Sequence, residues 1–385
     1  FTYTGKKMEL SGWGRYPTAI AKIIEPVSQK SARTHFLKKM QGYPIIARGS
    51  GRSYGDSALA DHVLRTRFLD NFISLNTAEG TVTCGSGVQL RDMLDLVIPA
   101  GFFPPVLPGT KYVTVGGAIA TDIHGKNHHQ EGSFCQHLVS FDLLLASGEI
   151  IECSRSKKGD LFRATCGGMG LTGIILNATI TLKKVTSVFI DQRTRAANNL
   201  SECMDIFNAS EDCEYSVAWL DAQAQGKHRG RSLIHTGNHS KKGVCQPIPR
   251  REHYIPSITP SKLLNKYSIK LLNELLYRSQ VIRRKSKQVS YESYFFPLDG
   301  IKNWNLIYGS KGFIQYQFVV PMDCSLEAIT VILERISDSG TAPTLSVLKK
   351  FAKGNDNYLS FPRAGYTLAM DFKRDDKLSP LLDQL

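Results

Sequence analysis

Apolar residues in the first half of the chain occur in short runs that are separated by glycine and polar turns, a pattern typical of β-strands. The predicted strands cover 43–47, 62–65, 80–84, 141–145, 150–153 and 172–182. A helix is predicted over 89–98, because Leu90, Met93, Leu94 and Val97 recur at spacings of three and four. The segment 43–185 is therefore expected to be an α+β region rich in glycine turns.

The pattern differs on both sides of this region. Residues 1–42 begin with a turn-rich lead-in and continue as a mixed helical stretch that ends near Gly42. After residue 186, helices are predicted over 201–207 and 326–337, and strands over 215–221, 288–296 and 313–320. The change near residue 186 predicts two domains, 1–186 and 187–385.

The charge balance is unusual for a chain of ordinary composition. The 385 residues hold 48 Lys and Arg against 34 Asp and Glu, a net charge of +14, which suits nucleic acid, a phosphorylated ligand or an anionic membrane surface. Aromatic and basic residues do not interleave as in nucleic-acid modules, so no nucleic-acid partner is expected. The sequence contains no CxxC pair, so no zinc site is predicted. It also has no run of about 18 apolar residues, so no membrane-spanning helix is predicted. The start lacks the pattern of a secretory signal, so we expect a cytoplasmic protein or one peripheral to the cytoplasmic or periplasmic face of a membrane.

Three glycine-rich segments carry the clearest chemical signal. The first, 47–56, reads ARGSGRSYGD, the second lies within 105–129, and the third, 167–173, reads GGMGLTG. Closely spaced glycines let backbone N–H groups approach an anion. None of the three is a GxGxxG motif at the start of a helix, and none is a P-loop. One extended ligand lying along several backbones, such as a dinucleotide, accounts for all three, whereas a tight turn cluster is the simpler alternative for any one of them.

Together these segments resemble the FAD-binding domain of the vanillyl-alcohol-oxidase-type flavoprotein superfamily. Within it, ARGSGRSYGD, LPGTKYVTVGGAIATDIHGKNHH, CGGMGLTG and FIQYQFVVP resemble the branch that oxidises the ribose of a polyprenyl phosphate. The resemblance implies an α+β, two-domain FAD-binding fold with an antiparallel-sheet substrate domain. It also implies a C-terminal segment that returns to the FAD domain and carries a lysine near the flavin. Because this sequence stops at Leu385, we expect that segment to be absent from it.

The resemblance also assigns the residues of the flavin cradle. The cofactor-binding residues that it implies are Arg48, Gly49, Ser50, Gly51, Arg52, Ser53, Tyr54, Gly55, Asp56, Gly109, Thr114, Val115, Gly116, Gly117, Thr121, Asp122, Ile123, His124 and Ile175. Relatives that attach FAD covalently have His in the place of Arg52. Arginine cannot form that bond, so noncovalent FAD is expected.

Three residues are expected to act in catalysis by resemblance: His124, Lys126 and Tyr54. His124 follows a strand-like run, 118–123, and taken alone it is more often a buried structural histidine. Lys126 taken alone is a surface lysine, whereas an ammonium in the substrate pocket suits a phosphate or a developing alkoxide. His128 and His129 have no carboxylate or further histidine at ligand spacing, so no metal site is predicted.

The substrate-facing residues implied by resemblance are Trp219, Gln317, Lys349, Phe351 and Ala369. Gln315 and Gln317 stand two apart on an apolar strand, so both point to one face, where an inward amide needs hydrogen-bond partners. Trp219 taken alone is equally well a core residue. Relatives that nitroaromatic inhibitors modify covalently have Cys in the place of Ala369, so that thiol target is expected to be missing here.

The implied reaction is the oxidation of the 2-hydroxyl of polyprenylphosphoryl-β-D-ribose to the 2-keto sugar, the first half of an epimerisation to an arabinose donor for the cell envelope. A keto-sugar reductase is the implied partner. The segment 260–288 is rich in leucine and in basic residues. This composition fits a contact with an anionic membrane surface and a solvated helix equally well. The alternative activity is an FAD-dependent oxidase of a soluble polyol or aldonolactone.

Overall fold

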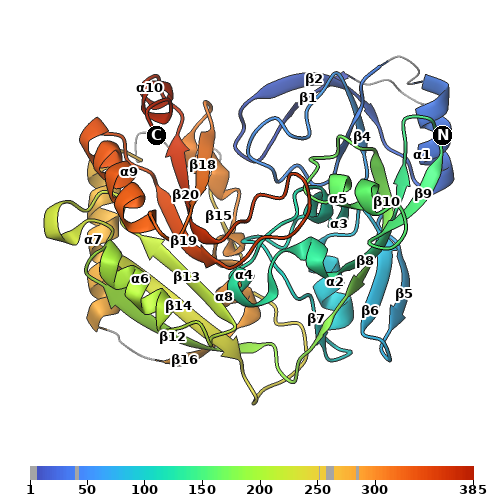
Figure 1. Cartoon of the computed structure of the whole chain (residues 1–385). Coiled ribbons are helices and arrows are strands. Elements are labelled where there is room, and N and C mark those ends of the chain that lie inside the picture. Colours follow the sequence, from blue (N-terminus) through green and yellow to red (C-terminus); the bar gives the residue numbers. More distant parts are fainter. Residues whose placement is uncertain (1–6, 40–42, 251, 257–263, 283–285) are drawn as a thin grey trace.

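The computed structural model describes residues 7–39, 43–250, 252–256, 264–282 and 286–385. Figure 1 shows two halves, each with its own sheets: the N-terminal half on the right and the C-terminal half on the left. Both termini of the drawn chain lie near the upper edge of this view, one on each half.

The N-terminal half begins with a four-stranded sheet in the order β1-β2-β4-β3. Its elements are β1 (Lys7–Ser11), β2 (Thr18–Ile24), α1 (Gln29–Lys39), β3 (Ile46–Arg48) and β4 (His62–Arg65). The turn-rich lead-in is confirmed at residues 12–17, but the helical stretch expected after it was wrong over 18–24, which is strand β2. Met8 and Leu10 pair with Ala21 and Ala19 in an antiparallel hairpin, and tertiary pairing of this kind overrides a weak local pattern.

A second, five-stranded antiparallel sheet has the order β5-β6-β10-β8-β9. Its elements are β5 (Phe72–Asn76), β6 (Thr81–Gly85), β8 (Leu138–Leu144), β9 (Ile150–Ser154) and β10 (Ile174–Thr181). A short pair, β7 (Phe102–Phe103) with β11 (Lys183–Lys184), lies beside it. The helices of this half are α2 (Leu90–Val97), α3 (Val115–Ala120), α4 (His128–Glu131), the 3-10 turn η1 (Phe134–His137) and α5 (Gly159–Thr165). The predicted helix over 89–98 is confirmed, and its four apolar residues are buried.

The strand expected over 118–123 is instead the end of helix α3, and this prediction was wrong. Thr114 caps the helix, because its hydroxyl accepts a hydrogen bond from the Gly117 N–H at 3.2 Å. A small-residue run has no strong period of its own, so the cap and the packing of Val115, Ala118 and Ile119 in the core decide its conformation.

The C-terminal half is built on a seven-stranded sheet, and each adjacent strand pair in it is antiparallel. Its strands are β12 (Phe189–Ala197), β13 (Tyr215–Leu220), β14 (Ser232–His239), β16 (Lys287–Ser290), β18 (Phe313–Val320), β19 (Leu345–Phe351) and β20 (Gly365–Lys373). Its order is β16-β12-β14-β13-β19-β20-β18. The helices are α6 (Leu200–Asn208), η2 (Gly226–His228), α7 (Lys266–Ile282), α9 (Ser325–Ser339) and α10 (Leu378–Leu382).

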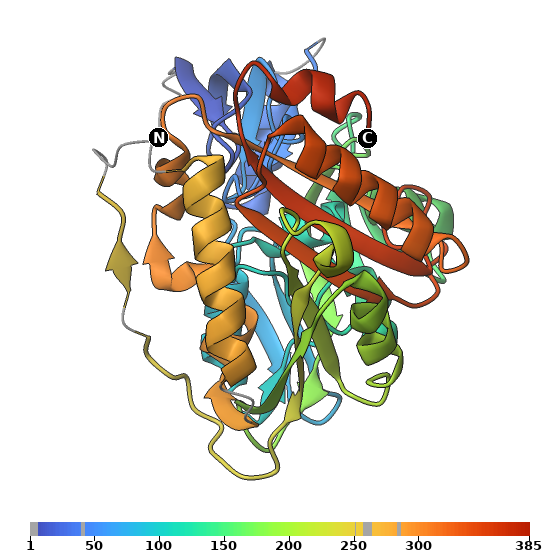
Figure 2. The same cartoon turned by 90° about the vertical axis from the view of Figure 1, so that its left-hand side faces the viewer.

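One face of this sheet is covered by helices and the other is turned toward the N-terminal half. Figure 2 shows α6, α7 and α9 in front of the sheet, on its outer side. The alternate residues Leu348, Leu368 and Met370 are buried in the core beneath these helices. The intervening residues of the same strands are therefore presented to the N-terminal half.

A segment between β16 and β18 joins the two halves. It contains α8 (Tyr291–Phe295), η4 (Pro297–Gly300), β17 (Ile301–Lys302), which pairs with β15 (His253–Tyr254), and η5 (Trp304–Tyr308). The strand predicted over 288–296 was wrong after Ser290, which caps α8 by accepting from the Ser293 N–H. Aromatic residues of α8 pack into the core of the N-terminal half, so burial rather than period decides this segment.

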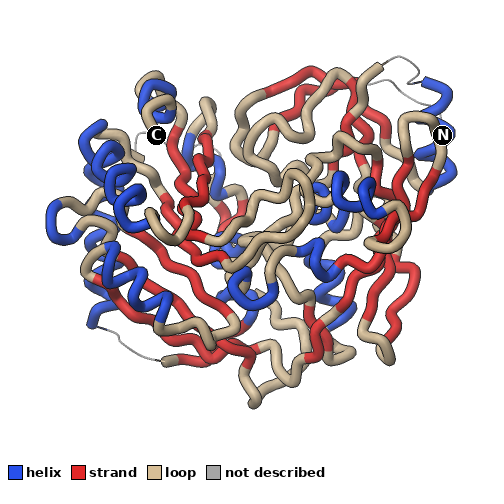
Figure 3. The backbone as a smooth tube through the Cα atoms, viewed as in Figure 1, coloured by secondary structure: helices blue, strands red, loops and turns tan. Residues whose placement is uncertain are grey.

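The predicted boundary near residue 186 falls between β11 and β12 and stays a prediction. No helix in the described ranges is long and apolar enough to cross a membrane. Figure 3 shows one long loop, 352–364 between β19 and β20, that extends from the C-terminal half across to the other half.

Candidate active site

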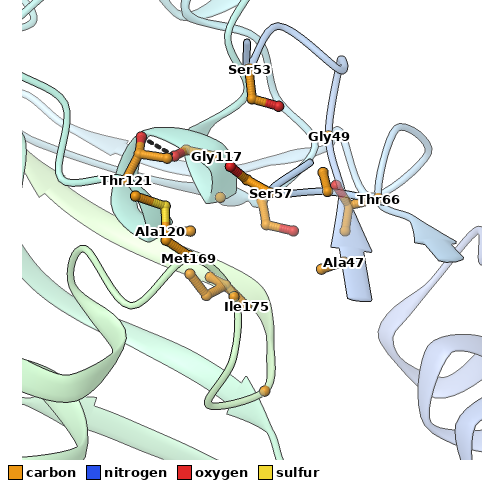
Figure 4. Close-up of a pocket in the computed structure, with 15 residues that line it drawn as sticks. Ala47, Gly49, Ser53, Ser57, Thr66, Gly117, Ala120, Thr121, Met169 and Ile175 are labelled. Carbon is orange, nitrogen blue, oxygen red and sulfur yellow. Dashed lines mark hydrogen bonds between the residues drawn. The ribbon is translucent and has the colours of Figure 1, made fainter. Parts of the chain in front are cut away.

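The three glycine-rich segments converge on one pocket, which Figure 4 shows in close-up. The first segment and β3 line one side, α3 lines a second, and the turn before β10 lines the third. The lining residues are Ala47, Gly49, Ser53, Ser57, Ala58, Thr66, Ser86, Gly116, Gly117, Ala120, Thr121, Met169, Gly170, Gly173 and Ile175. Segments more than a hundred residues apart in sequence therefore form a single site.

At Gly49 and Gly116 the wall of this pocket has no room for a side chain. A Cβ at Gly49 would stand 2.1 Å from Thr114 Oγ1, and one at Gly116 would stand 2.9 Å from Ser86 Cβ. The Ser86 hydroxyl is buried and has no hydrogen-bond partner among the described residues. Bare backbone and an unpaired hydroxyl fit a polar cofactor such as FAD, whose phosphates and ribityl chain bind backbone N–H groups and hydroxyls.

The two arginines of the first segment have different surroundings. Arg48 is buried, and its guanidinium donates to the carbonyl oxygens of Ser11 at 2.6 Å and Ala58 at 3.3 Å. These donors hold the loop backbone, and the expected contact of Arg48 with FAD stays a prediction. Arg52 lies over Trp13, with 3.9 Å between its guanidinium carbon and the ring centroid, and over Tyr112 at 4.8 Å. Stacking of this kind fixes a guanidinium in place.

Four residues from neighbouring strands form a row across the open face of the seven-stranded sheet. The register pairs Trp219 with Val347, Val347 with Ala369, and Ala369 with Gln317. Directly paired residues point to the same face, so the row presents Trp219, Ala369 and Gln317 together. These three, predicted separately from the sequence, are thus brought to one surface, which we call the substrate face. Lys349 and Phe351 follow Val347 at intervals of two on the same face.

His124 connects the N-terminal half to this face. Its Nε2 lies 3.3 Å from the Gln317 side-chain nitrogen, and its Nδ1 lies 3.5 Å from Lys349 Nζ. Its ring packs edge-on against Phe351, with centroids 4.7 Å apart. Burial, and then the charge of Lys349, hold the pKa of His124 well below its usual range, so the ring is uncharged at neutral pH. Burial also lowers the pKa of Lys349 to about 8.

Lys126 contacts the backbone of α8, and its expected place in catalysis stays a prediction. Its ammonium donates to the carbonyl oxygens of Tyr294 at 2.5 Å and Phe295 at 2.9 Å, at the end of α8. Burial, and then the charge of Lys349, lower its pKa to about 7. Its donors are thus engaged in holding α8, so its predicted place in catalysis has no support in these contacts.

Tyr54 lies where the first glycine segment meets the substrate face. Its ring packs edge-on against Phe313, the first residue of β18, at 5.4 Å. Burial, followed by the charge of Asp371, raises its pKa well above the usual range, so the hydroxyl keeps its proton. Asp371 was not singled out from the sequence. Its place on β20, two residues after Ala369, is the signal that could have found it.

Asp122, expected at the cofactor, has its side chain in a buried hydrogen-bond network. Its carboxylate accepts from Ser133 Oγ at 3.0 Å, the Cys135 N–H at 2.8 Å, Asn355 Nδ2 at 2.6 Å, Asn357 Nδ2 at 3.2 Å and Ser360 Oγ at 2.6 Å. The last three donors belong to the 352–364 loop, which Figure 1 shows reaching the N-terminal half. Asp122 therefore fastens that loop to the N-terminal half, and Phe361 of the loop stacks 6.0 Å from His124.

Several pocket residues were missed in the sequence, among them Ser57, Thr66 and Ser86. They lie outside the glycine runs, and only the fold brings them there. In the described part of the chain no group of three or more His, Cys, Asp or Glu side chains is placed to hold a metal. His129 Nε2 lies instead 2.8 Å from the Cys213 carbonyl oxygen. The expectation of no metal stays a prediction.

Comparison with known proteins agrees with this geometry. The FAD binding domain family matches residues 30–154, which include the first two glycine segments. The chain is 36% identical to decaprenylphosphoryl-β-D-ribose oxidase of Mycolicibacterium smegmatis over 380 residues, 94% of this chain and 82% of that protein. It is 31% identical to an uncharacterised protein of Streptomyces coelicolor over 77% of this chain and 84% of that protein. The likeness to L-gulonolactone oxidase of Bos taurus is weaker, 27% identity over 52% of this chain and 45% of that enzyme.

The fold and the pocket thus define an FAD-dependent oxidoreductase of the vanillyl-alcohol-oxidase type, with two α+β domains. Within that class, the chain belongs to the family of decaprenylphosphoryl-β-D-ribose oxidase.

Proposed function

We propose that this enzyme oxidises the 2-hydroxyl of a polyprenylphosphoryl-β-D-ribose to the 2-keto sugar. The observation that carries the proposal is the row of Trp219, Ala369 and Gln317, with Lys349 beside it. It gives a flat aromatic surface, an amide and a cation where a phosphorylated pentose would lie. The likeness over most of the chain to an enzyme that acts on such a ribose supports the same substrate class.

Different residues of the chain are assigned to binding FAD, the sugar and the phosphate. We assign the FAD to the backbone of 49–56, to α3 and to Ile175, and when bound it supplies the two-electron oxidation of the alcohol. Gln317, with its amide donating to Thr367 Oγ1 at 3.0 Å, is oriented toward His124 and can bind a sugar hydroxyl. Lys349, which is mostly protonated at neutral pH, offers a positive charge to the phosphate.

Anaerobic reduction of the bound flavin tests this function. The purified holoenzyme should lose its visible flavin band when mixed with polyprenylphosphoryl ribose, and free ribose, alditols and aldonolactones at the same concentration should leave the band unchanged. Bleaching by an alditol or aldonolactone, and not by the lipid-linked ribose, would instead establish the alternative, an oxidase of soluble polyols or lactones.

We expect the FAD to be held without a covalent bond. Arg52 stacks between Trp13 and Tyr112 at the position where relatives with covalent FAD have His, and a guanidinium does not form that linkage. Acid precipitation should release all of the yellow colour into the supernatant. Colour that stays in the washed pellet would contradict the expectation.

Helix α7 is the proposed contact with an anionic membrane. It exposes Tyr267, Leu271, Leu272 and Leu275, which share one helical stripe, and Lys270 is exposed beside them. Arg251, Lys262, Arg283, Arg284 and Lys285 of the same basic segment lie outside the described residues. Figure 2 shows α7 on the outer side of the seven-stranded sheet, with its length open to the surroundings.

Flotation with liposomes tests that contact. The protein should float with vesicles that contain acidic lipid, and Leu272→Gln with Leu275→Gln should weaken this binding about 100-fold, because each of the two buried leucines contributes about 1.5 kcal/mol. Leu326→Gln with Val331→Gln, on the exposed side of α9, is the matched control and should float as the original protein does. Equal flotation of both double variants would rule out α7 as the contact.

The product of the proposed reaction is a ketone on a lipid-linked sugar. A keto-sugar reductase that delivers hydride to the opposite face of carbon 2 would complete the epimerisation, so we propose such a reductase as the partner. A lipid-linked substrate also supports a site of action at a membrane surface, at its cytoplasmic or its periplasmic face.

A further inference from the structure

Asp371 on β20 is a buried carboxylate that has no cationic partner among the described residues. Its side chain is 2% exposed, and its Oδ1 accepts one hydrogen bond, from Gln315 Nε2 at 2.8 Å. No residue in the described ranges donates to its Oδ2. By contrast, the buried Asp221 is paired with Arg231 at 2.7 Å and accepts from Asn273 at 2.8 Å. An unpaired buried carboxylate is unfavourable for stability, so the position calls for a chemical role.

The register places Asp371 on the substrate face. It pairs with Gln315 on β18 and Leu345 on β19, and it follows Ala369 by two residues, so its side chain shares the face of Ala369 and Gln317. Its charge acts on Tyr54, which belongs to the first glycine segment. Asp371 therefore lies where the substrate face meets the FAD-binding half.

The other polar groups of this site have their polar atoms engaged by neighbours or keep their protons. Lys349 is mostly protonated at neutral pH. Both ring nitrogens of His124 face the donors Gln317 and Lys349. The Lys126 ammonium is engaged with two carbonyl oxygens. The Tyr54 hydroxyl keeps its proton. Asp371 is the one carboxylate among these groups, and no described donor occupies its Oδ2.

We propose that Asp371 accepts the proton of the sugar hydroxyl that is oxidised, a role that rests on the function proposed above. In this step the O–H bond breaks and its proton passes to the Asp371 carboxylate, while the oxygen's electron pair forms the second carbon–oxygen bond. The C–H bond at the same carbon breaks, and its hydride carries two electrons to the oxidised flavin. The alcohol becomes a ketone and the flavin is reduced, so atoms and electrons balance.

The electrostatics agree with this assignment. Burial raises the pKa of Asp371 to about 7, against the opposite effect of the Gln315 hydrogen bond. A general base is most effective when its pKa lies near the working pH. The other titratable groups that face Asp371 are Tyr54 and Tyr308, and burial raises the pKa of both above the usual range, so both are neutral near pH 7. The rate of flavin reduction should therefore rise with pH through about 7 and level off above it.

Single-turnover flavin reduction across this pH range tests the proposal. Asp371→Asn should keep its flavin and its substrate affinity, reduce flavin about 100- to 10,000-fold more slowly, and lose the rise near pH 7. Asp221→Asn removes a paired buried carboxylate from the same half and is the matched control: the free energy of unfolding should fall, but the pH profile should keep its shape. Gln315→Leu removes the donor that favours the ionised form, so the rise should move to higher pH.

A second measurement needs no substrate. Infrared difference spectra of the holoenzyme against Asp371→Asn should show a carboxylic acid C=O band that titrates near pH 7. A band that titrates below about pH 5, or an unchanged rate and pH profile in Asp371→Asn, would overturn the role of Asp371. If the original enzyme is not reduced by the lipid-linked ribose at all, the proposed function fails instead, and the infrared titration still reports on the carboxylate.

Discussion

Replacing Asp122 with Ala should lower the free energy of unfolding by about 3 to 5 kcal/mol, because several buried donors would lose their acceptor at once. The carboxylate is fully buried and accepts five hydrogen bonds, three of them from the 352–364 loop. The loop should then detach from the N-terminal half, and Phe361 should lose its place beside His124. Activity should fall together with stability. Denaturation by urea and the rate of trypsin cleavage at the exposed Lys353 and Arg363 measure the two effects.

Two further variants separate the carboxylate from its backbone. Asp122 has φ of +40°, in the left-handed region, where Asn is tolerated better than Ala. Asp122→Asn should therefore keep the backbone, yet lose most of the stabilisation, since its amide turns one donor toward other donors. Asp142→Ala is the matched control, because that half-buried carboxylate accepts one described hydrogen bond, from Asn177. A loss below about 1 kcal/mol in both Asp122 variants would show that the network does not hold the loop.

Replacing Gly117 with Leu should give a well-folded protein that purifies without flavin. A Cβ there would meet Thr114 Oγ1 at 3.2 Å and Val113 Cγ1 at 3.8 Å, so the variant side chain is tolerated by the fold but extends from the pocket wall. The removal of a glycine from α3 favours the helix by up to about 1 kcal/mol, whereas filling the pocket should weaken FAD binding about 10- to 100-fold. The ratio of visible to ultraviolet absorbance and a titration with FAD measure this loss.

Gly159→Leu is the control for that variant. Gly159 is the first residue of α5, a Cβ there meets no atom within 4 Å, and it is not among the pocket-lining residues. It should bind FAD as the original protein does. Full flavin content in Gly117→Leu would show that the pocket between the glycine segments does not hold the cofactor.

Much of the site could be predicted because its signals are local. Glycines at 49 and 116 stand where a Cβ would collide with Thr114 or Ser86, so the glycine-rich composition marks the pocket. Gln317 lies on a strand that was predicted from the sequence, and the confirmed strand β18 has the bounds that were predicted. The rest depends on partners distant in sequence. Asp122 pairs with Asn355, and Arg48 pairs with Ser11. The residues next to them in sequence contain no pattern that indicates these contacts.

The sequence by itself predicted a dinucleotide ligand along several glycine-rich segments, because closely spaced glycines are a local signal. Its motifs also showed a resemblance to flavin-dependent oxidases over nearly the whole length. The tertiary structure alone decided which polar groups are engaged and which are open. It buries Asp122 and Lys126 among structural partners, folds 115–120 as a helix, and leaves Asp371 unpaired on the substrate face. The physical reason is that desolvation and hydrogen-bond saturation depend on what the whole fold packs around a side chain, not on its neighbours in sequence.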